Sequence, residues 1–277
     1  MATRLLLLLV CLPLLGIGGF QALFAPKKEP WPRSEAHDPA ASQVLDHQAW
    51  DSLLRRYLQP GEDGINRFDY AALNQSGRGP LESYLATLAA TPVSRLRRDE
   101  QLAYWINLYN ALTVRTVAEA YPVASIRDID LSPGLFARGP WGKQLVTVEG
   151  VALSLNDIEH RILRPVWNDP LIHYGVNCAA LGCPNLAARA YTGATVQAAL
   201  AAGARAYVSS SRGVWLDGER IGVSSIYAWF QDDFGGNDAG ILGHLERYAE
   251  GTLKARLEQA TRIHQHAYDW GLNDVRP

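Results

Sequence analysis

The spacing of apolar residues along the chain predicts one long buried helix and several shorter amphipathic ones. From Asp99 to Ala120 apolar side chains fall on nearly every face of a helix, which indicates a central element surrounded by protein. Asp99 is a candidate N-cap of this helix, and Pro122 follows its end. Apolar residues at helical intervals predict further helices within residues 44–58, 81–88, 196–207 and 225–230.

Strand signals are shorter and indicate small hairpins. Gln144–Val148 and Val151–Leu153 alternate on either side of a Glu-Gly pair, and a second hairpin is expected around Asp217-Gly218. The apolar run Leu171–Cys178 is also interpreted as a strand. This mixture predicts an α+β fold, in which a small, mostly antiparallel sheet is packed by helices around the central buried helix 99–120.

A short helix is expected after the first hairpin, where it would carry two candidate site residues. Ser154 is its predicted N-cap, and Asp157 follows three residues later in a capping-box position. Glu159 and His160 come next, on or beside its apolar stripe. The C-terminal run YDWGLND is unusually aromatic for a disordered segment, so we expect it to pack back on the body.

The first 25 residues are interpreted as a signal peptide or an N-terminal membrane anchor. A positive residue precedes the apolar run Leu5–Phe20, which is shorter than the roughly 20 residues that a spanning helix needs. Residues 26–44 hold several prolines and mixed charges without an apolar period, so they are interpreted as a linker. Residues 45–277 are then expected to form a single globular domain. The protein is expected to be exported, and to be periplasmic or anchored to the membrane by residues 5–25.

Composition narrows the class of protein. Of the 277 residues, 48% are hydrophobic and 19% are charged, which is ordinary for a globular protein. The net charge of −2 provides no general attraction for nucleic acid or acidic membranes. We therefore expect no nucleic-acid partner, and contact with a membrane only through the N-terminal segment. No cofactor is predicted.

Two cysteines remain beyond the leader, Cys178 and Cys183, both within Ile172–Pro184. Their spacing allows a disulfide across a small loop, which export would favour and which would contribute about 2–3 kcal/mol. It equally allows a nucleophilic or redox thiol, whose pKa must be lowered by a nearby histidine, a positive charge or a helix N-terminus. A zinc site would need His160 and His173 as further ligands, and the spacing is not the two-residue knuckle typical of zinc. No metal site is predicted.

Histidine is the natural base for such a thiol. In a regular strand His173 and Cys178 are an odd number of residues apart and point to opposite faces. A bulge at Gly175 would be needed to bring them together. His160 comes from a different element and is therefore the preferred base. Glu159 lies about 100° away from it around a helix, so it is not simply the orienting carboxylate of His160.

Asn107 and Asn110 lie three residues apart on one face of the buried helix. A buried amide without a partner costs about 1–3 kcal/mol, so each must find one. One interpretation is that each amide fixes a neighbouring backbone loop. The other is that one of them orients a catalytic group or binds a ligand carbonyl.

Several of these segments together resemble domain-of-unknown-function family 547. The resemblance covers most of residues 45–273, and it rests on AYWINLYNAL (103–112), LSLNDIEHRILRP (153–165), IHYGVNCAALGCPNL (172–186), SSIYAWFQDDFG (224–235) and YDWGLN (268–273). Some relatives join this domain to glutaredoxin-like or signalling modules, which implies thiol or glutathione chemistry. The polar positions that the resemblance implies are Asn107, Asn110, Glu159, His160, His173, Cys178 and Cys183.

Two hypotheses about function follow. In the first, the protein is an exported thiol-dependent enzyme, either a hydrolase or transferase or a catalyst of thiol–disulfide or deglutathionylation chemistry. Cys178 attacks a small-molecule or peptide thiol or acyl substrate, with His160 or His173 as base. Asn107 or Glu159 orients that base, in a cysteine-hydrolase-like arrangement. In the second, the protein is a non-catalytic envelope binding protein whose two cysteines form a structural disulfide.

Overall fold

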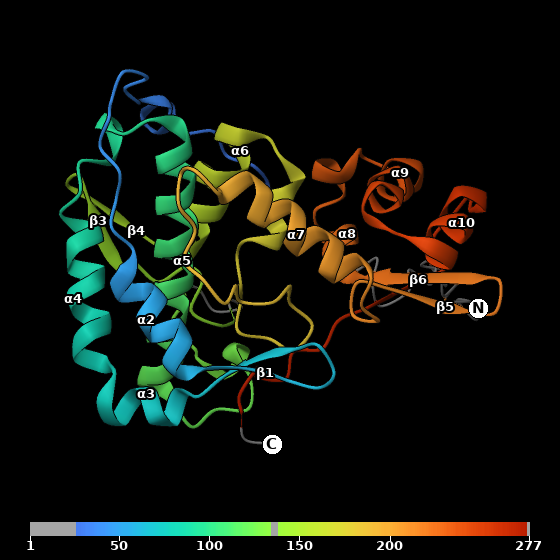
Figure 1. Cartoon of the computed structure of the whole chain (residues 1–277), viewed down its shortest axis with the longest axis horizontal. Helices are drawn as coiled ribbons and strands as arrows, with labels where there is room; N and C mark the ends of the chain where they lie inside the picture. Colours follow the sequence, from blue (N-terminus) through green and yellow to red (C-terminus); the bar gives the residue numbers. More distant parts are fainter. Residues whose placement is uncertain (1–25, 134–137, 276–277) are drawn as a thin grey trace, which may run out of the picture.

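The computed structural model describes residues 26–133 and 138–275, and the predicted leader, residues 1–25, lies outside them. Helices are the main regular structure, in a larger group around α5 and a smaller group beside β5 and β6, with α7 between them (Figure 1). The helices are α2 (Gln48–Tyr57), α3 (Tyr70–Ser76), α4 (Arg78–Ala89), α5 (Arg98–Ala120), α6 (Arg164–Trp167), α7 (Val196–Val208), α8 (Ser225–Trp229), α9 (Asp238–Tyr248) and α10 (Gly251–Gln259). Asp157–Leu163 is π-helical, and the 3-10 helices are Pro32–Glu35, Val93–Arg95, Ile126–Asp128, Pro170–Tyr174 and Gln231–Phe234.

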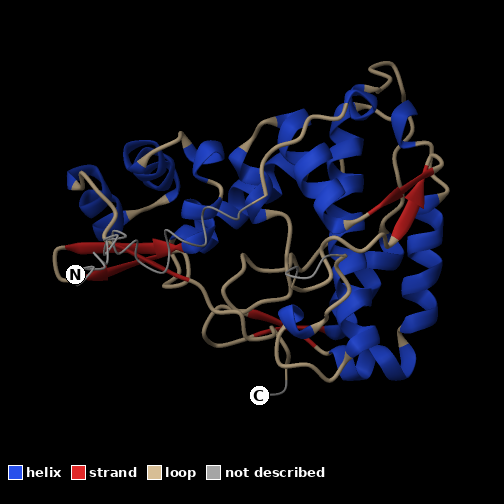
Figure 2. Ribbon diagram, turned by 180° about the vertical axis from the view of Figure 1, so that it is seen from behind, coloured by secondary structure: helices blue, strands red, loops and turns tan. Residues whose placement is uncertain are grey.

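Strands are short and lie at the edges of the helical groups (Figure 2). In the described parts of the chain they form three small sheets. Two are antiparallel hairpins, β1 (Leu58–Pro60) with β2 (Asn66–Phe68) and β3 (Val146–Val148) with β4 (Val151–Leu153). The third joins β5 (Val214–Asp217) and β6 (Arg220–Ser224) in antiparallel fashion and adds β7 (Gln265–Ala267) parallel to β6. The α+β prediction and both predicted hairpins are confirmed, although the strands are divided among separate sheets.

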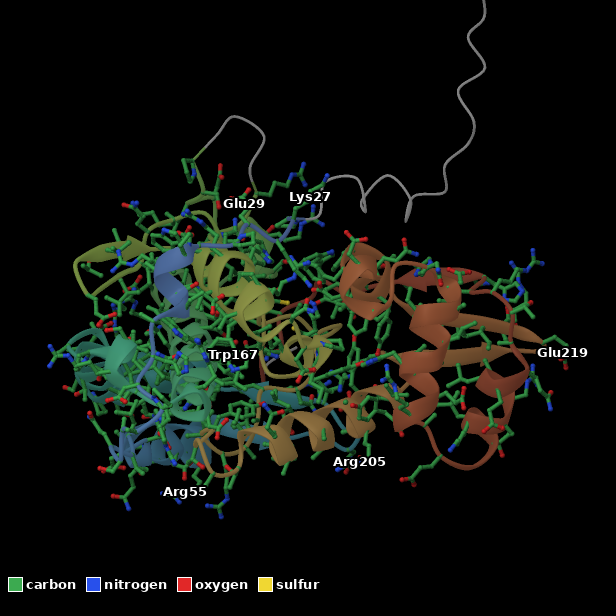
Figure 3. All side chains as sticks on the ribbon, turned by 90° about the horizontal axis from the view of Figure 1, so that it is seen from above. Lys27, Glu29, Arg55, Trp167, Arg205 and Glu219 are labelled. Atoms are coloured by element: carbon green, nitrogen blue, oxygen red, sulfur yellow. The ribbon has the colours of Figure 1, made fainter. Side chains whose placement is uncertain are left out.

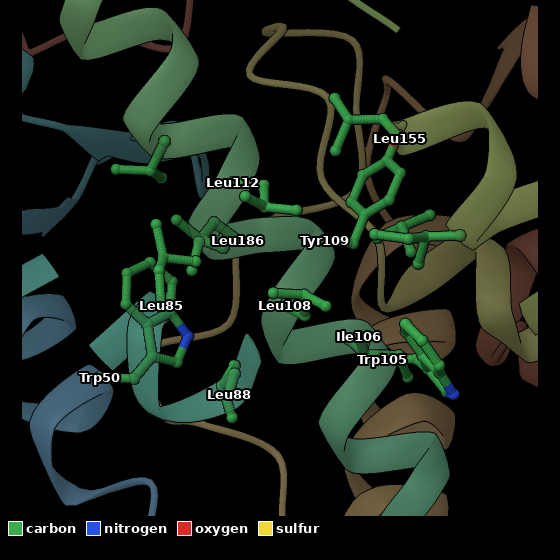
Figure 4. Close-up of a cluster of buried hydrophobic side chains, with 14 of the residues drawn as sticks. Trp50, Leu85, Leu88, Trp105, Ile106, Leu108, Tyr109, Leu112, Leu155 and Leu186 are labelled. Carbon is green, nitrogen blue, oxygen red and sulfur yellow. The ribbon is translucent and has the colours of Figure 1, made fainter. Parts of the chain in front are cut away.

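Helix α5 lies at the centre of the larger group, as predicted. Side chains of α2 and α4, among them Trp50, Leu85 and Leu88, pack in the same buried cluster as those of α5 (Figure 4). The N-cap residue is Arg97 and makes no side-chain capping bond, so the prediction that Asp99 caps the helix is wrong. Asp99 lies instead in the first turn, where its charge still favours the positive end of the helix dipole.

The predicted strand Leu171–Cys178 is wrong. Residues Pro170–Tyr174 form a 3-10 helix, whose N-cap Asp169 accepts a hydrogen bond from Leu171 N at 2.9 Å. An aspartate followed by proline is a helix start signal, because proline fits the first helical position and the aspartate satisfies a free N–H. The apolar run obscured this signal. The pleat argument that separated His173 from Cys178 therefore does not apply.

Residues 26–44, interpreted from the sequence as a linker, lie along the larger group of helices. Gln101 donates a hydrogen bond to Ala36 O at 2.8 Å, and Arg98 donates one to Glu35 O at 2.9 Å. Nearer the start of this segment, Glu29 N donates a hydrogen bond to His160 O at 3.0 Å. In Figure 3, Glu29 lies at the upper edge of the larger group, whereas Glu219 lies at the far end of the smaller group. Within residues 26–133 and 138–275, no helix has the length and apolar character needed to cross a membrane.

Candidate functional site

A cavity of about 710 Å³ lies where α5, the π-helical stretch, the 3-10 helix 170–174, α8 and the C-terminal segment meet. This is the size of a small-molecule site. Its aromatic wall consists of Tyr109, Trp141, Trp229, Phe230, Tyr268 and Trp270. Its polar lining includes Glu159, His160, His173, Cys178 and Cys183. The structure thus brings five of the seven predicted polar positions into one cavity, including His173, which the strand prediction had placed on the face opposite Cys178.

The two cysteines are free and adjacent. Cys178 Sγ lies 3.0 Å from Cys183 Sγ, and the backbone N–H of Cys178 also donates a hydrogen bond to Cys183 Sγ at 3.1 Å. The hydroxyl of Tyr268 contacts Cys178 Sγ at 2.9 Å. Cys178 is partly exposed at the cavity, whereas Cys183 is buried. Between the described residues, no histidine nitrogen is hydrogen-bonded to either sulfur.

These contacts divide the proton unequally between the two sulfurs. The hydrogen bond that Cys178 donates to Cys183, together with burial, raises the pKa of the Cys178 thiol well above its usual value. Burial acts to raise the pKa of Cys183 as well, but the hydrogen bonds from the Cys178 thiol and N–H outweigh it, and the pKa is lowered. Of the two sulfurs, Cys183 therefore gives up its proton more readily, and Cys178 retains its own.

Buried amides hold the cysteine loop in place. Asn110 on α5 donates to Gly175 O at 2.9 Å and accepts from Asn177 N at 2.8 Å. The residue after Cys178, Ala179, has a φ of 59°, in the left-handed region that a non-glycine residue seldom adopts. Its N–H donates to the side chain of Asn177 at 2.9 Å. The amide of Asn110 therefore fixes a backbone loop, which is the structural interpretation made from the sequence.

The C-terminal segment 268–274 packs against the same loop, as its aromatic composition predicted. Leu181 N donates to Gly271 O at 2.7 Å, and Asn273 N donates to Ala179 O at 3.0 Å. A side chain at Gly182 would meet this segment, since a Cβ there would lie 2.7 Å from Asp269 N. The close approach of the two backbones explains the glycine before Cys183 and places Tyr268 on the sulfurs.

Asn107 makes a similar pair of bonds elsewhere. It donates to Tyr191 O at 2.8 Å and accepts from Tyr191 N at 3.0 Å, and it is outside the cavity lining. The prediction that Asn107 orients a catalytic base is therefore not supported by its contacts, because both ends of its amide are occupied by backbone.

His173 is oriented by a carboxylate that the sequence analysis did not single out. Its Nε2 lies 2.7 Å from Asp233 Oδ2, and its ring stacks on Phe230 with centroids 4.4 Å apart. Burial acts to raise the pKa of Asp233, but hydrogen bonds from His173 and Arg164 hold it well below the usual carboxyl range. Because Nε2 donates to this carboxylate, Nδ1 of a neutral His173 carries the free lone pair. His173 is thus the histidine arranged as a base.

His160, the base preferred from the sequence, is arranged differently. Arg164 Nη1 lies 3.0 Å from His160 Nδ1, and since a guanidinium only donates, Nδ1 is the acceptor. Burial lowers the pKa of His160 to about 4 against the attraction of Glu159, so the ring is neutral at pH 7 with its proton on Nε2. His160 therefore presents an N–H donor, and these contacts favour His173 over it as the base.

Glu159 lies between the two imidazoles. Its Oε1 is 3.9 Å from the Nδ1 of His160 and 3.9 Å from the Nδ1 of His173, beyond hydrogen-bonding range of both. All three residues line the cavity, and Glu159 and His160 do so from a π-helical stretch, a geometry often found at functional sites. Across residues 26–133 and 138–275, no group of three or more His, Cys, Asp or Glu side chains is placed to hold a metal ion.

Removing the hydroxyl of Tyr268 tests how it affects the sulfurs. Its contact lowers the pKa of both cysteines, so Tyr268→Phe should raise the pKa of the pair and leave less thiolate at pH 7. A hydrogen bond to a charged group is worth about 1.5–3 kcal/mol, so labelling by iodoacetamide should slow roughly 10-fold and its pH midpoint should rise. Tyr248→Phe is the control, since that hydroxyl has no hydrogen bond to any part of the chain that is described. Equal rates in the wild type and Tyr268→Phe would refute the contact.

Comparison with known families confirms the resemblance over the middle of the chain. Residues 93–208 match the family model described as "Protein of unknown function, DUF547". The matched part contains α5, both cysteines, Glu159, His160 and His173, whereas Asp233 and Tyr268 lie beyond it. Searches of curated proteins and of solved structures found no match.

Proposed function

We propose that this chain, whose residues 93–208 match the DUF547 family model, is a thiol–disulfide oxidoreductase acting on a small disulfide that enters the aromatic cavity. The observation that carries the proposal is the separation of 3.0 Å between Cys178 Sγ and Cys183 Sγ at the wall of that cavity. A disulfide has an S–S distance of about 2.05 Å, so a small side-chain movement converts the free pair into the bonded one. Each sulfur is in contact with the other sulfur and not with an imidazole of the described chain.

The first step uses Cys178, the more exposed sulfur. Its proton passes to Cys183 Sγ along the hydrogen bond that joins them. The Cys178 thiolate then attacks one sulfur of the substrate, so that a mixed disulfide forms and the substrate S–S bond breaks. The departing thiolate takes the proton from Cys183 and leaves as a thiol.

The second step uses Cys183 as the resolving cysteine. Its thiolate attacks Cys178 Sγ, the Cys178–Cys183 disulfide forms, and the second half of the substrate leaves as a thiolate. The substrate disulfide has gained two electrons, and the cysteine pair has lost two. An external dithiol reductant must return the pair to its reduced form.

A second candidate function is favoured by the Asp233–His173 pair. In an acyl-transfer reaction Cys178 would attack a thioester or amide, with the free Nδ1 of His173 as base and Asp233 orienting the ring. This resembles the cysteine-hydrolase-like arrangement expected from the sequence. Two observations favour the redox proposal. The sulfurs contact each other directly, and within the described chain neither sulfur is hydrogen-bonded to His173.

The proposal is tested by incubating the reduced protein with 2-hydroxyethyl disulfide. The wild type should lose two hydrogens in its mass and release two equivalents of thiol. Cys183→Ser should stop at the mixed disulfide and gain the mass of half the reagent on Cys178, since the resolving sulfur is gone. Cys178→Ser should do neither, and thermal unfolding should show that both variants fold.

Three other results would each contradict a part of the proposal. A wild type that turns over thioesters but exchanges with no disulfide would support the acyl-transfer candidate. A Cys178–Cys183 bond that forms in air but resists millimolar dithiol would support the structural disulfide of a non-catalytic binding protein. A mixed disulfide on Cys183 in the Cys178→Ser variant would reverse the roles of the two sulfurs.

Export remains part of the proposal. In an oxidising compartment the cysteine pair would rest as a disulfide unless a reductant reached it. Location in the periplasm or at a membrane is therefore tested by fractionating cells and by determining the redox state of the pair in each fraction.

A further inference from the structure

The wall of the cavity connects the sulfurs to an arginine. The Tyr268 hydroxyl lies 2.9 Å from Cys178 Sγ, and the centroids of the Tyr268 and Trp270 rings are 4.6 Å apart. The guanidinium of Arg127 then lies 5.1 Å from the centroid of Trp270. Trp229 stacks beside Trp270, with centroids 5.5 Å apart. A reactive sulfur therefore stands at one end of an aromatic surface, and a cation stands at the other.

The charges around the cavity leave this cation uncompensated. Arg127 and Arg138 line the cavity, and neither has an ion-pair partner among the residues that the structure describes. Arg164, in contrast, is neutralised by Asp233 at 2.6 Å. Among the described residues of the lining Glu159 is the one carboxylate, and its Oε1 lies 3.9 Å from the Nδ1 of each histidine.

Arginine is suited to bind a carboxylate, because its planar fork offers paired N–H donors. The ring of Trp270 limits the orientations of the guanidinium and shields one of its faces from water, which strengthens its attraction for an anion. The indoles of Trp229 and Trp270 would cover an apolar linker between the anion and the sulfur.

From these contacts we infer that the site selects small disulfides that carry a carboxylate, which Arg127 binds while the linker lies on Trp270 and Trp229. This inference rests on the proposed function and names its substrate class. The disulfide reaches Cys178 when its carboxylate is bound at the opposite end of the wall.

Three disulfides of similar size and different charge test the inference. They are 3,3′-dithiodipropionate, which is anionic, 2-hydroxyethyl disulfide, which is neutral, and cystamine, which is cationic. The wild type should have the highest kcat/KM for the anion. Arg127→Gln should lower that value roughly 10-fold or more through KM, because a charged hydrogen bond is lost, and should leave the neutral disulfide unchanged.

Matched variants show whether the effect belongs to Arg127. Arg127→Lys should retain part of the preference, since the charge remains but the fork is lost. Arg220→Gln removes an exposed arginine on β6 and should change nothing. If the wild type reduces the three disulfides equally, or if Arg127→Gln keeps the preference for the anion, the inference is overturned while the proposed function stands.

Binding of an unreactive analogue shows whether the anion site or the proposed disulfide reaction has failed. The thioether 3,3′-thiodipropionate has the same carboxylates but no S–S bond, and its binding can be followed by calorimetry or by the fluorescence of the cavity tryptophans. Binding to the wild type and not to Arg127→Gln would support the anion site even if no disulfide were reduced, in which case only the proposed reaction would fall. Equal binding to both proteins, or to neither, would overturn the anion site.

Discussion

Replacing Asp233 by alanine is expected to lower the free energy of unfolding by about 3–5 kcal/mol, because it leaves a buried charge without its partner. The side chains of Asp233 and Arg164 are 5% and 4% exposed and lie 2.6 Å apart. Lys28 also reaches the carboxylate, at 2.8 Å, and His173 donates to it at 2.7 Å. A single residue therefore joins the N-terminal segment, α6 and the imidazole of His173.

Urea unfolding at pH 7 measures this loss. Asp232→Ala is the matched control, since the neighbouring carboxylate is exposed and has no bonded side-chain partner in the described structure. Because the pKa of Asp233 is depressed, its contribution is complete above the ordinary carboxyl pKa and is lost as the pH falls through the lowered value. Wild-type stability should therefore fall more steeply in acid than that of Asp233→Ala. A loss below about 1 kcal/mol would show that the ion pair is not important for stability.

Replacing Asn110 by alanine should cost about 3 kcal/mol and also change the chemistry of the thiols. The substitution removes two hydrogen bonds and leaves Gly175 O and Asn177 N unpartnered inside the protein, at about 1–3 kcal/mol for each buried group. Asn177 immediately precedes Cys178, so the loop that aligns the two sulfurs should loosen. Because the hydrogen bonds from the Cys178 thiol and N–H lower the pKa of Cys183, the pH midpoint of iodoacetamide labelling should then rise.

Asn107→Ala is the informative control for this result. Asn107 is equally buried and also makes two bonds to backbone, but it holds Tyr191 rather than the cysteine loop. The two variants should therefore be destabilised to a similar degree, and only Asn110→Ala should alter the labelling of the thiols. If Asn107→Ala abolished activity while it kept the wild-type labelling profile, the orienting role suggested from the sequence would return.

Much of the fold could be predicted because local patterns determine it. Helix α5 and both hairpins follow from periodicity and from turn residues close in sequence. The predicted capping box was correct as well, since Asp157 N donates to Ser154 Oγ at 3.1 Å and Ser154 N donates to Asp157 Oδ2 at 2.9 Å. The segment after Asp169 failed because its apolar residues are buried in a 3-10 helix, and burial alone does not distinguish this from a strand.

The site was harder to predict, because its geometry depends on contacts between distant segments. Asp233 approaches His173 across 60 residues of sequence, and Tyr268 reaches Cys178 across 90. Both lie in segments that the family resemblance included, SSIYAWFQDDFG and YDWGLN, and that was the available signal. The proton positions on the two histidines could not be predicted for the same reason, since Arg164 and Asp233 determine which nitrogen carries the proton.

The C-terminal segment 268–274 has a consequence for how the protein is made. The ribosome adds Cys178 90 residues before it adds Tyr268, whose hydroxyl and neighbouring backbone complete the pocket around the sulfurs. Contacts of such long sequence separation form late in folding, because the intervening chain must first be ordered. Helix α5 and its partners can therefore assemble on the growing chain while both thiols are still uncovered. During that interval the thiols are open to oxidants and to other cysteines, and they remain so until this segment docks.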